Sequence, residues 1–278
     1  MLTFGEVTRG IQECKLDLEL LYADRSKRDR FERKWSEFVA SDPAHSEVFK
    51  REGSDKIVFL TESLTPKRLD DRPSVLLLLG NPASHSVQSG MCFAFEGSNR
   101  EHRFWIALRN TGILEFFSDS LTPSPLWHER NRIRKEEFFG LRYCSPFCIG
   151  IAVFFSMPST ASDPKWSGVA GLLRLFGQRA LKAIAMEEEE RIAGLLQQFM
   201  ISGGGIMAFQ KDAYEGVRSP QSSPYSFDLA KNGKLCGEYK HDTRIHLVGT
   251  PPTRFLNSRR HQGALAVYKD YLITKLLR

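Results

Sequence analysis

The sequence predicts an α/β protein, a single domain with a central, mostly parallel four-stranded sheet flanked by helices. Four short apolar runs, at residues 75–79, 148–155, 205–209 and 244–249, are followed by polar loops or turn residues. Strands that are buried on both faces of a parallel sheet have this continuous apolar pattern. Helical segments separate the runs, and an alternation of strands and helices along the chain is typical of a parallel α/β sheet.

The N-terminal part predicts a helical extension, residues 1–54, packed on a core domain of residues 55–278. Apolar residues between Phe4 and Phe38 recur at near-helical spacing. Residues 55–62 then predict a short strand that precedes the first buried run of the core domain.

Helices are expected after the buried strands. Ser98 and Glu101 form a capping box, so a helix is expected to begin at Ser98 and to end at Gly112. Asp163 is expected to cap a helix whose first residue is Pro164. Further helices are expected at 164–177, 178–200 and 264–277.

Composition limits the class of protein. The chain has 278 residues, of which 41% are hydrophobic and 26% charged, which is enough to bury a sizeable core. The mean hydropathy is -0.32, and the apolar runs are far shorter than a membrane span. The N-terminus does not have the basic and then apolar pattern of a leader. These features predict a cytoplasmic protein that does not associate with a membrane. We expect the protein to be a monomer.

The chain is mildly basic. Lys and Arg number 39 against 33 Asp and Glu, a formal net charge of +6. Positive residues cluster at 25–34, 130–135 and 252–260, a pattern compatible with a polyanionic partner. The acidic run at 187–190 predicts a solvated helix face.

Cysteine usage predicts reduced thiols and no metal. The chain has five cysteines, and only Cys144 and Cys148 lie close together in the sequence. Zinc and iron–sulfur sites usually take four ligands in paired short spacings, and no second pair exists.

Four loops follow the buried strands, at 80–97, 156–167, 210–218 and 249–260. In parallel sheets, chemistry is carried out beyond the carboxyl ends of the strands. The residues in these loops are therefore the candidates for a functional site. The motifs in these loops and next to them, in chain order, are Gly80-Asn81-Pro82, Gly90-Met91-Cys92-Phe93, Arg103-Phe104-Trp105, a strand end at 154–158 and a final loop at 249–255.

This ordered set resembles the uracil-DNA glycosylase superfamily, from about residue 75 to residue 255. The resemblance implies that the chain is a monofunctional DNA glycosylase for uracil or a related deaminated base, with no metal and no cofactor. It implies that Asn81 places the attacking water and that Phe93 stacks on the flipped base, with Gly80 and Pro82 lining the base site. Such an enzyme must extrude the base, because the stack hides the bond to be cleaved.

The chain departs from the family pattern at two positions. Ser156 stands where family members place an Asn that reads the uracil edge, and it is expected to bind the base there. A hydroxyl offers fewer fixed contacts than an amide. Thr250 stands where a His stabilises the uracil anion, and it is expected to be a catalytic residue in that place. Loss of one preorganised donor can cost about 10²–10³ in rate.

The final loop predicts the contacts with DNA that contains uracil or another damaged base. Arg254 or Phe255 is expected to wedge into the gap that the flipped nucleotide leaves. Arg259 and Arg260 are expected to contact phosphates.

Two other classes of function remain open. The first is a nucleic-acid-binding protein on the same fold with little or no catalysis, which the missing His and Asn favour. The second is an unrelated α/β hydrolase of small molecules. It is disfavoured because the sequence has no G-x-S-x-G elbow, Walker motif, G-x-G-x-x-G or H-E-x-x-H.

Overall fold

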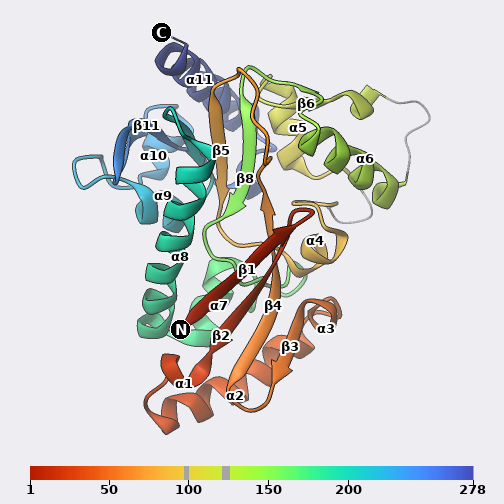
Figure 1. Ribbon diagram of the computed structural model, residues 1–278, viewed down its shortest axis with the longest axis vertical. Coiled ribbons are helices and arrows are strands. Elements are labelled where there is room, and N and C mark those ends of the chain that lie inside the picture. Colours follow the sequence, from red (N-terminus) through yellow and green to blue (C-terminus); the bar gives the residue numbers. More distant parts are fainter. Residues whose placement is uncertain (97–99, 121–125, 278) are drawn as a thin grey trace. The chain divides into compact units, whose positions relative to one another are not determined.

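The computed structural model describes residues 1–96, 100–120 and 126–277. It has the α/β architecture expected, with a mixed sheet of parallel and antiparallel strands flanked by helices (Figure 1). Within the described residues nine strands take part, rather than four, and β6 and β7 form a separate two-stranded pairing. The expected four-stranded sheet is therefore too small.

The chain divides into two compact units. Unit 1 consists of Met1–Ser63, Gly80–Cys92 and Val153–Ile192, and unit 2 consists of Leu64–Leu79, Phe93–Ala152 and Ala193–Arg278. The expected domain boundary between residues 54 and 55 does not coincide with a boundary of either unit. Each unit is assembled from three separate segments of the chain.

Unit 1 begins with an antiparallel hairpin where the sequence predicted a helix. Strand β1 (Leu2–Thr8) pairs with β2 (Ile11–Asp17) across the turn Arg9-Gly10, whose φ values are 50° and 81°. Two positive φ values match the turn to the right-handed twist of the strands. Strand β2 buries Gln12, Cys14 and Leu16. The helical prediction was wrong here because burial recurs every two residues, the period of a strand.

The remaining strands of unit 1 extend this hairpin. Strand β4 (Lys56–Leu64) pairs antiparallel with β2 and also with β3 (Phe49–Glu52). The strand expected at 55–62 is confirmed as β4.

Helices of unit 1 pack through aromatic side chains. In α2 (Arg25–Ala40) the buried residues are Phe31, Trp35 and Phe38, so the helical prediction is confirmed for this part of the N-terminal segment. The ring of Phe31 stacks on that of Phe176 with centroids 5.4 Å apart. The short helices of this unit are α1 (Leu18–Leu21), α3 (His45–Val48) and α4 (Ser84–Ser89).

Helix α7 (Gly168–Phe176) begins four residues later than predicted, with Ser167 as its N-cap. Asp163 instead accepts a hydrogen bond from the backbone N–H of Lys165 at 2.8 Å in the preceding turn. The helix ends as expected at Gly177, whose φ of 80° favours glycine. The long helix α8 (Gln178–Phe199) follows, close to the expected bounds.

Unit 2 contains the four buried strands that the sequence predicted, and one more. The strands lie in the order β8 (Cys148–Val153), β5 (Ser74–Leu79), β9 (Gly204–Ala208), β11 (Asp242–Gly249) and β10 (Cys236–Tyr239). The pairs β5–β9 and β9–β11 are parallel, whereas β10 is antiparallel to β11. Sequence reasoning missed β10 because this edge strand buries only Tyr239.

Helices cover both faces of the unit 2 sheet. A Cβ at Gly205 of β9 would meet Leu272 of α11, and one at Gly249 of β11 would meet Tyr214 of α9. Gly249 pairs with Ala208, which lies three residues from Gly205 along β9. Successive residues of a strand point to opposite faces of the sheet, so two residues that are three positions apart also face opposite sides. The helices α9 and α11 therefore lie on opposite sides of the sheet.

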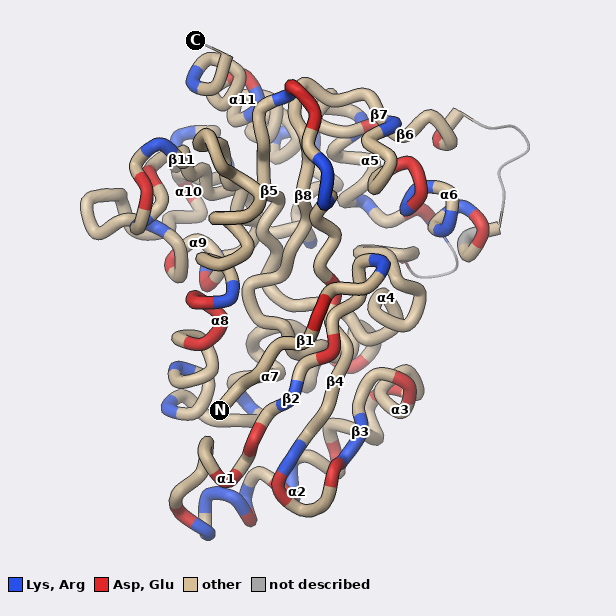
Figure 2. Tube along the Cα trace, viewed as in Figure 1, with Lys and Arg blue, Asp and Glu red and all other residues tan. Residues whose placement is uncertain are grey.

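Three helices of unit 2 differ from expectation. Helix α5 (Arg103–Asn110) is capped by His102, and Ser98 lies outside the described residues. Helix α11 (Arg259–Leu276) begins five residues before 264. The sequence analysis missed α6 (Trp127–Phe139), which carries charged residues of both signs (Figure 2). The other short elements are β6 (Glu115–Phe116), η1 (Phe117–Ser120), β7 (Tyr143–Cys144), α9 (Lys211–Val217), α10 (Phe227–Lys231) and η2 (Thr253–Phe255).

Candidate functional site

The Gly80-Asn81-Pro82 motif follows β5 and is bound to the 155–159 segment of unit 1. The carbonyl of Gly80 accepts from the N–H of Phe155 at 2.8 Å, and that of Pro82 accepts from the N–H of Ser159 at 3.0 Å. These two backbone hydrogen bonds fix both sides of Asn81. The side chain of Asn81 is therefore presented from a rigid loop rather than from a mobile one.

The amide group of Asn81 has one defined orientation. Its Nδ2 donates to the hydroxyl of Ser159 at 2.9 Å, and to the carbonyls of Met157 at 3.4 Å and Pro82 at 3.3 Å. Among the described residues none donates a hydrogen bond to its Oδ1. The half-buried side chain thus retains a carbonyl oxygen that can accept a hydrogen bond from a water molecule.

Ser156 lies one residue after Phe155 and is fully buried. Both its N–H and its hydroxyl donate to Oε1 of Glu188, at 2.6 Å and 2.5 Å. The expected role of Ser156 in reading a base edge is not supported, because its hydroxyl proton is already donated within the protein and its side chain has no exposed surface.

Glu188 is a residue that sequence reasoning misplaced. The acidic run at 187–190 was expected on a solvated face, but Glu188 has no exposed surface. Its Oε2 accepts from Nε of Arg191 at 2.7 Å, and Nη2 of Arg191 donates to the carbonyl of Val153 at 2.5 Å. The i, i+3 spacing of Glu188 and Arg191 was the available signal. Within unit 1, this pair fixes the backbone at Val153 and Ser156 to α8.

The thiol of Cys14 lies beside the same buried pair. Burial, reinforced by the negative charge of Glu188, raises the pKa of Cys14 to about 12. The thiol is therefore protonated at neutral pH and acts as a small apolar side chain of the core.

Phe93 in unit 2 has an uncommon backbone conformation and a crowded ring. Its φ is 51°, a value that non-glycine residues rarely adopt. Its ring stacks on His102 with centroids 4.3 Å apart and contacts Phe104 at 4.6 Å. Nε1 of Trp105 donates to the Phe93 carbonyl at 3.1 Å. The structure thus brings together two of the successive sequence motifs, Phe93 and Arg103-Phe104-Trp105.

Thr250 follows β11 and is fully buried. Its hydroxyl donates to the carbonyl of Ala208 at 3.2 Å, and its own carbonyl accepts from the Tyr225 hydroxyl at 3.0 Å. The catalytic role expected for Thr250 is not supported, because its only side-chain donor is bonded within the sheet.

The four residues expected to contact DNA lie at the end of the same loop and the beginning of α11. Arg254, in η2, is exposed and lies over the ring of Phe255 at 4.9 Å, and its carbonyl accepts from Arg103 at 2.8 Å. Arg259 and Arg260 occupy the first turn of α11 and are exposed. These positions are compatible with phosphate contacts.

A buried ion-pair network in unit 2 had no counterpart in the sequence analysis. Arg134 of α6 is fully buried and pairs with Glu101 and Asp119, and Arg109 of α5 pairs with the same two carboxylates. Burial alone would raise the pKa of Glu101, but hydrogen bonds from Arg109 and Arg134 hold it below its usual value. The network joins α5, α6 and η1. Part of the basic cluster at 130–135 is therefore neutralised inside unit 2.

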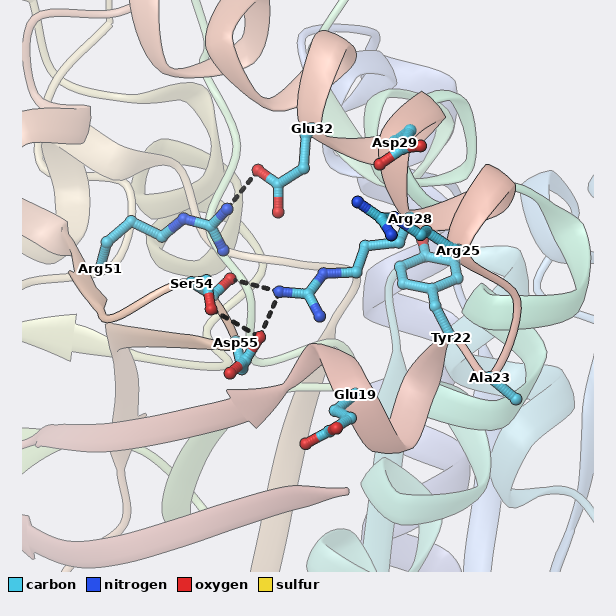
Figure 3. A pocket seen from close by; sticks show the side chains of 10 residues that line it. All are labelled: Glu19, Tyr22, Ala23, Arg25, Arg28, Asp29, Glu32, Arg51, Ser54 and Asp55. Carbon is cyan, nitrogen blue, oxygen red and sulfur yellow. Dashed lines mark hydrogen bonds and ion pairs between the residues drawn. The ribbon is translucent and has the colours of Figure 1, made fainter.

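A polar pocket of about 640 Å³ lies in unit 1 beside α2 (Figure 3). The side chains of Arg28, from α2, and Arg51, from β3, point toward one another in it. Arg28 pairs with Asp55, and Arg51 pairs with Glu32. The pocket is lined by Glu19, Tyr22, Ala23, Arg25, Arg28, Asp29, Glu32, Arg51, Ser54 and Asp55. Carboxylates outnumber arginines here, so the basic cluster at 25–34 does not form a positive surface at this pocket.

Within the described residues, no group of three or more His, Cys, Asp or Glu side chains is arranged to hold a metal ion. No described helix combines the length and apolarity needed to cross a membrane. In comparisons with known proteins, no protein-family model and no curated protein matches the chain.

Proposed function

We propose that this chain is a monofunctional DNA glycosylase that hydrolyses the N-glycosidic bond of uracil or a related deaminated base. The observation that carries the proposal is the anchored amide of Asn81 at the end of a buried strand. The order of motifs that resembles the uracil-DNA glycosylase superfamily supplies the reaction class. The anchored amide of Asn81 is a group that can position the attacking water, which is the central step of that reaction.

In the proposed reaction, Asn81 positions water rather than deprotonating it. Its Oδ1 accepts a hydrogen bond from one O–H of the water. This hydrogen bond directs a lone pair of the water oxygen toward C1′ of the sugar. The C1′–N bond breaks, its electron pair leaves with the base, the water oxygen bonds to C1′, and the proton passes to solvent. A dissociative step of this kind depends on placement more than on a strong base.

The flipped base is proposed to stack on Phe93, while backbone N–H groups stabilise its developing negative charge. Backbone donors are needed because the hydroxyls of Ser156 and Thr250 already donate within the protein. Arg259 and Arg260 are proposed to contact phosphates, and Arg254 or Phe255 to fill the gap left by the base.

The second candidate function is a nucleic-acid-binding protein without catalysis. It is favoured by the same two buried hydroxyls, which stand where the family has an Asn and a His. Under this candidate, Arg254, Arg259 and Arg260 bind DNA, and Asn81 only stabilises the loop.

One experiment separates the two candidates. The purified chain is incubated with labelled single-stranded and duplex oligonucleotides that contain uracil, hypoxanthine or xanthine at one position, and abasic sites are then cleaved with alkali. Scission at a deaminated base, and none in the matched thymine oligonucleotide, is the expected result. Binding without scission of any substrate supports the second candidate, and absence of both contradicts the two together.

A further inference from the structure

One surface of unit 2 combines aromatic rings with basic side chains. It is formed by α10, η2 and the first turn of α11. Phe227 of α10 is 37% exposed, so part of its ring is accessible to a ligand. We call this the aromatic–basic surface, and it consists of Phe227, Lys231, Arg254, Phe255, Arg259, Arg260 and His261.

Three rings form the centre of the aromatic–basic surface. The centroid of Phe227 lies 5.1 Å from that of Phe255 and 5.8 Å from that of His261, and the last two rings are 5.9 Å apart. Lys231 lies over the Phe227 ring at 5.6 Å. Each ring supports the others, so the exposed part of Phe227 is held in place rather than free to turn.

Hydrogen bonds fix the segments that carry these rings. Nδ1 of His261 lies 2.8 Å from the carbonyl of Phe255. Nη1 of Arg103 donates to the carbonyl of Arg254 at 2.8 Å, and Nη2 of Arg260 donates to Oδ1 of Asn232 at 2.9 Å. A preorganised surface of this kind loses little conformational entropy when a ligand binds.

The charge of this surface is strongly positive. Lys231 pairs with the exposed Asp228, whose negative charge also interacts with Arg260 at longer range. Within the described part of the chain, Arg254, Arg259 and Arg260 form no direct ion pair. The first turn of α11 contains no acidic residue. The start of a helix already carries a partial positive charge, so two adjacent arginines there repel it and each other. An anionic ligand would relieve this repulsion.

We propose that the aromatic–basic surface binds single-stranded DNA, with an unpaired base stacked on Phe227 and phosphates against Arg254, Arg259 and Arg260. Aromatic stacking requires the face of a base, which is free in a single strand but covered by neighbouring base pairs in a duplex. An undistorted duplex would offer no free base face to Phe227. The inference rests on the proposed function for the choice of DNA, and it adds Phe227 and a preference for single strands.

Binding by the full chain to labelled (dT)20, and to a duplex of the same length, tests the proposal by fluorescence anisotropy. We expect tighter binding to (dT)20 at equal salt. Phe227→Ala should weaken binding to (dT)20 about 5- to 150-fold, the range for loss of one stacked base, and leave duplex binding unchanged. Phe117→Ala is the matched control, because Phe117 is 56% exposed elsewhere in unit 2.

The charge contribution is measured by salt dependence. Arg259→Ala should lower the slope of log K against log salt for (dT)20 by about 0.7, the value for one phosphate contact of a single strand. Lys275→Ala, at the other end of the same helix, should leave the slope unchanged.

Three results would overturn the proposal: equal affinity for the two DNA forms, no effect of Phe227→Ala, or equal binding to (rU)20 or to poly-glutamate. The last result would indicate RNA or an acidic protein as the partner. Absence of alkaline scission with intact (dT)20 binding would contradict the glycosylase proposal alone, so the two failures are distinguishable.

Discussion

Glu188 binds Ser156 twice, since its Oε1 accepts hydrogen bonds from both the backbone N–H and the hydroxyl of that residue. The same carboxylate pairs with Arg191, whose side chain is only 5% exposed. Ser156 lies in the 155–159 segment, in which the hydroxyl of Ser159 accepts a hydrogen bond from the side-chain amide of Asn81. A charged pair on α8 therefore holds the loop that orients the proposed water-placing residue.

We predict that Glu188→Gln destabilises the chain strongly. Removal of the negative charge leaves Arg191 buried without an ionic partner, which typically costs about 3–5 kcal/mol. The change is measured as the free energy of unfolding in urea. Glu190→Gln, at an exposed position of the same acidic run, is the control and should change stability by less than about 0.5 kcal/mol. Equal small effects of the two substitutions would show that the buried pair contributes little.

Asn81→Ala should abolish most glycosylase activity while the protein stays folded. A misplaced water is expected to cost about 100-fold or more in rate. Loss of the hydrogen bond to Ser159 should cost only about 1 kcal/mol of stability. Scission of the uracil oligonucleotide is measured under single-turnover conditions, with Gln88→Ala as an exposed amide control in the same unit. Near-normal turnover of Asn81→Ala would mean that another group places the water.

Phe93→Ala separates a binding role from a packing role. If the ring stacks on the extruded base, the substitution should weaken binding of the free base by about 1–3 kcal/mol. If the ring serves only to pack against His102 and Phe104, the melting temperature should fall without a selective loss of binding. Calorimetric titration with the base and thermal unfolding are measured on one preparation.

Thiol reactivity should single out Cys144, the exposed cysteine. The pKa of Cys236 is raised by burial to about 11, so at pH 8 only about one molecule in a thousand carries that thiolate, and the pKa of Cys14 is higher still. A disulfide reagent at pH 8 should therefore modify one thiol rapidly in the native chain and all five in denaturant. Cys144→Ser should remove the rapid phase, and a rapid phase that survives would place the reactive thiol elsewhere.

The buried parallel strands were predictable because their signal is local. Strands β5, β8 and β9 are buried on both faces, and such strands are continuous apolar runs in any sequence. The position of Asn81 directly after β5 followed from the same runs. Edge strands such as β10 and the β1–β2 hairpin carry weaker, half-buried patterns, so their period of two was missed or was taken for a helical one.

Only the tertiary structure decided whether each candidate side chain is buried and which hydrogen bonds it makes. Ser156, Thr250 and Glu188 are polar residues that the sequence placed in loops or on a solvated face, yet all three are fully buried. Each satisfies its polar atoms through partners that lie tens of residues away or on a neighbouring element, as burial requires. The sequence by itself determined where the buried parallel strands lie and which loops follow them. Which of those residues keep a free polar atom depends on long-range hydrogen bonds, and only the folded chain forms these.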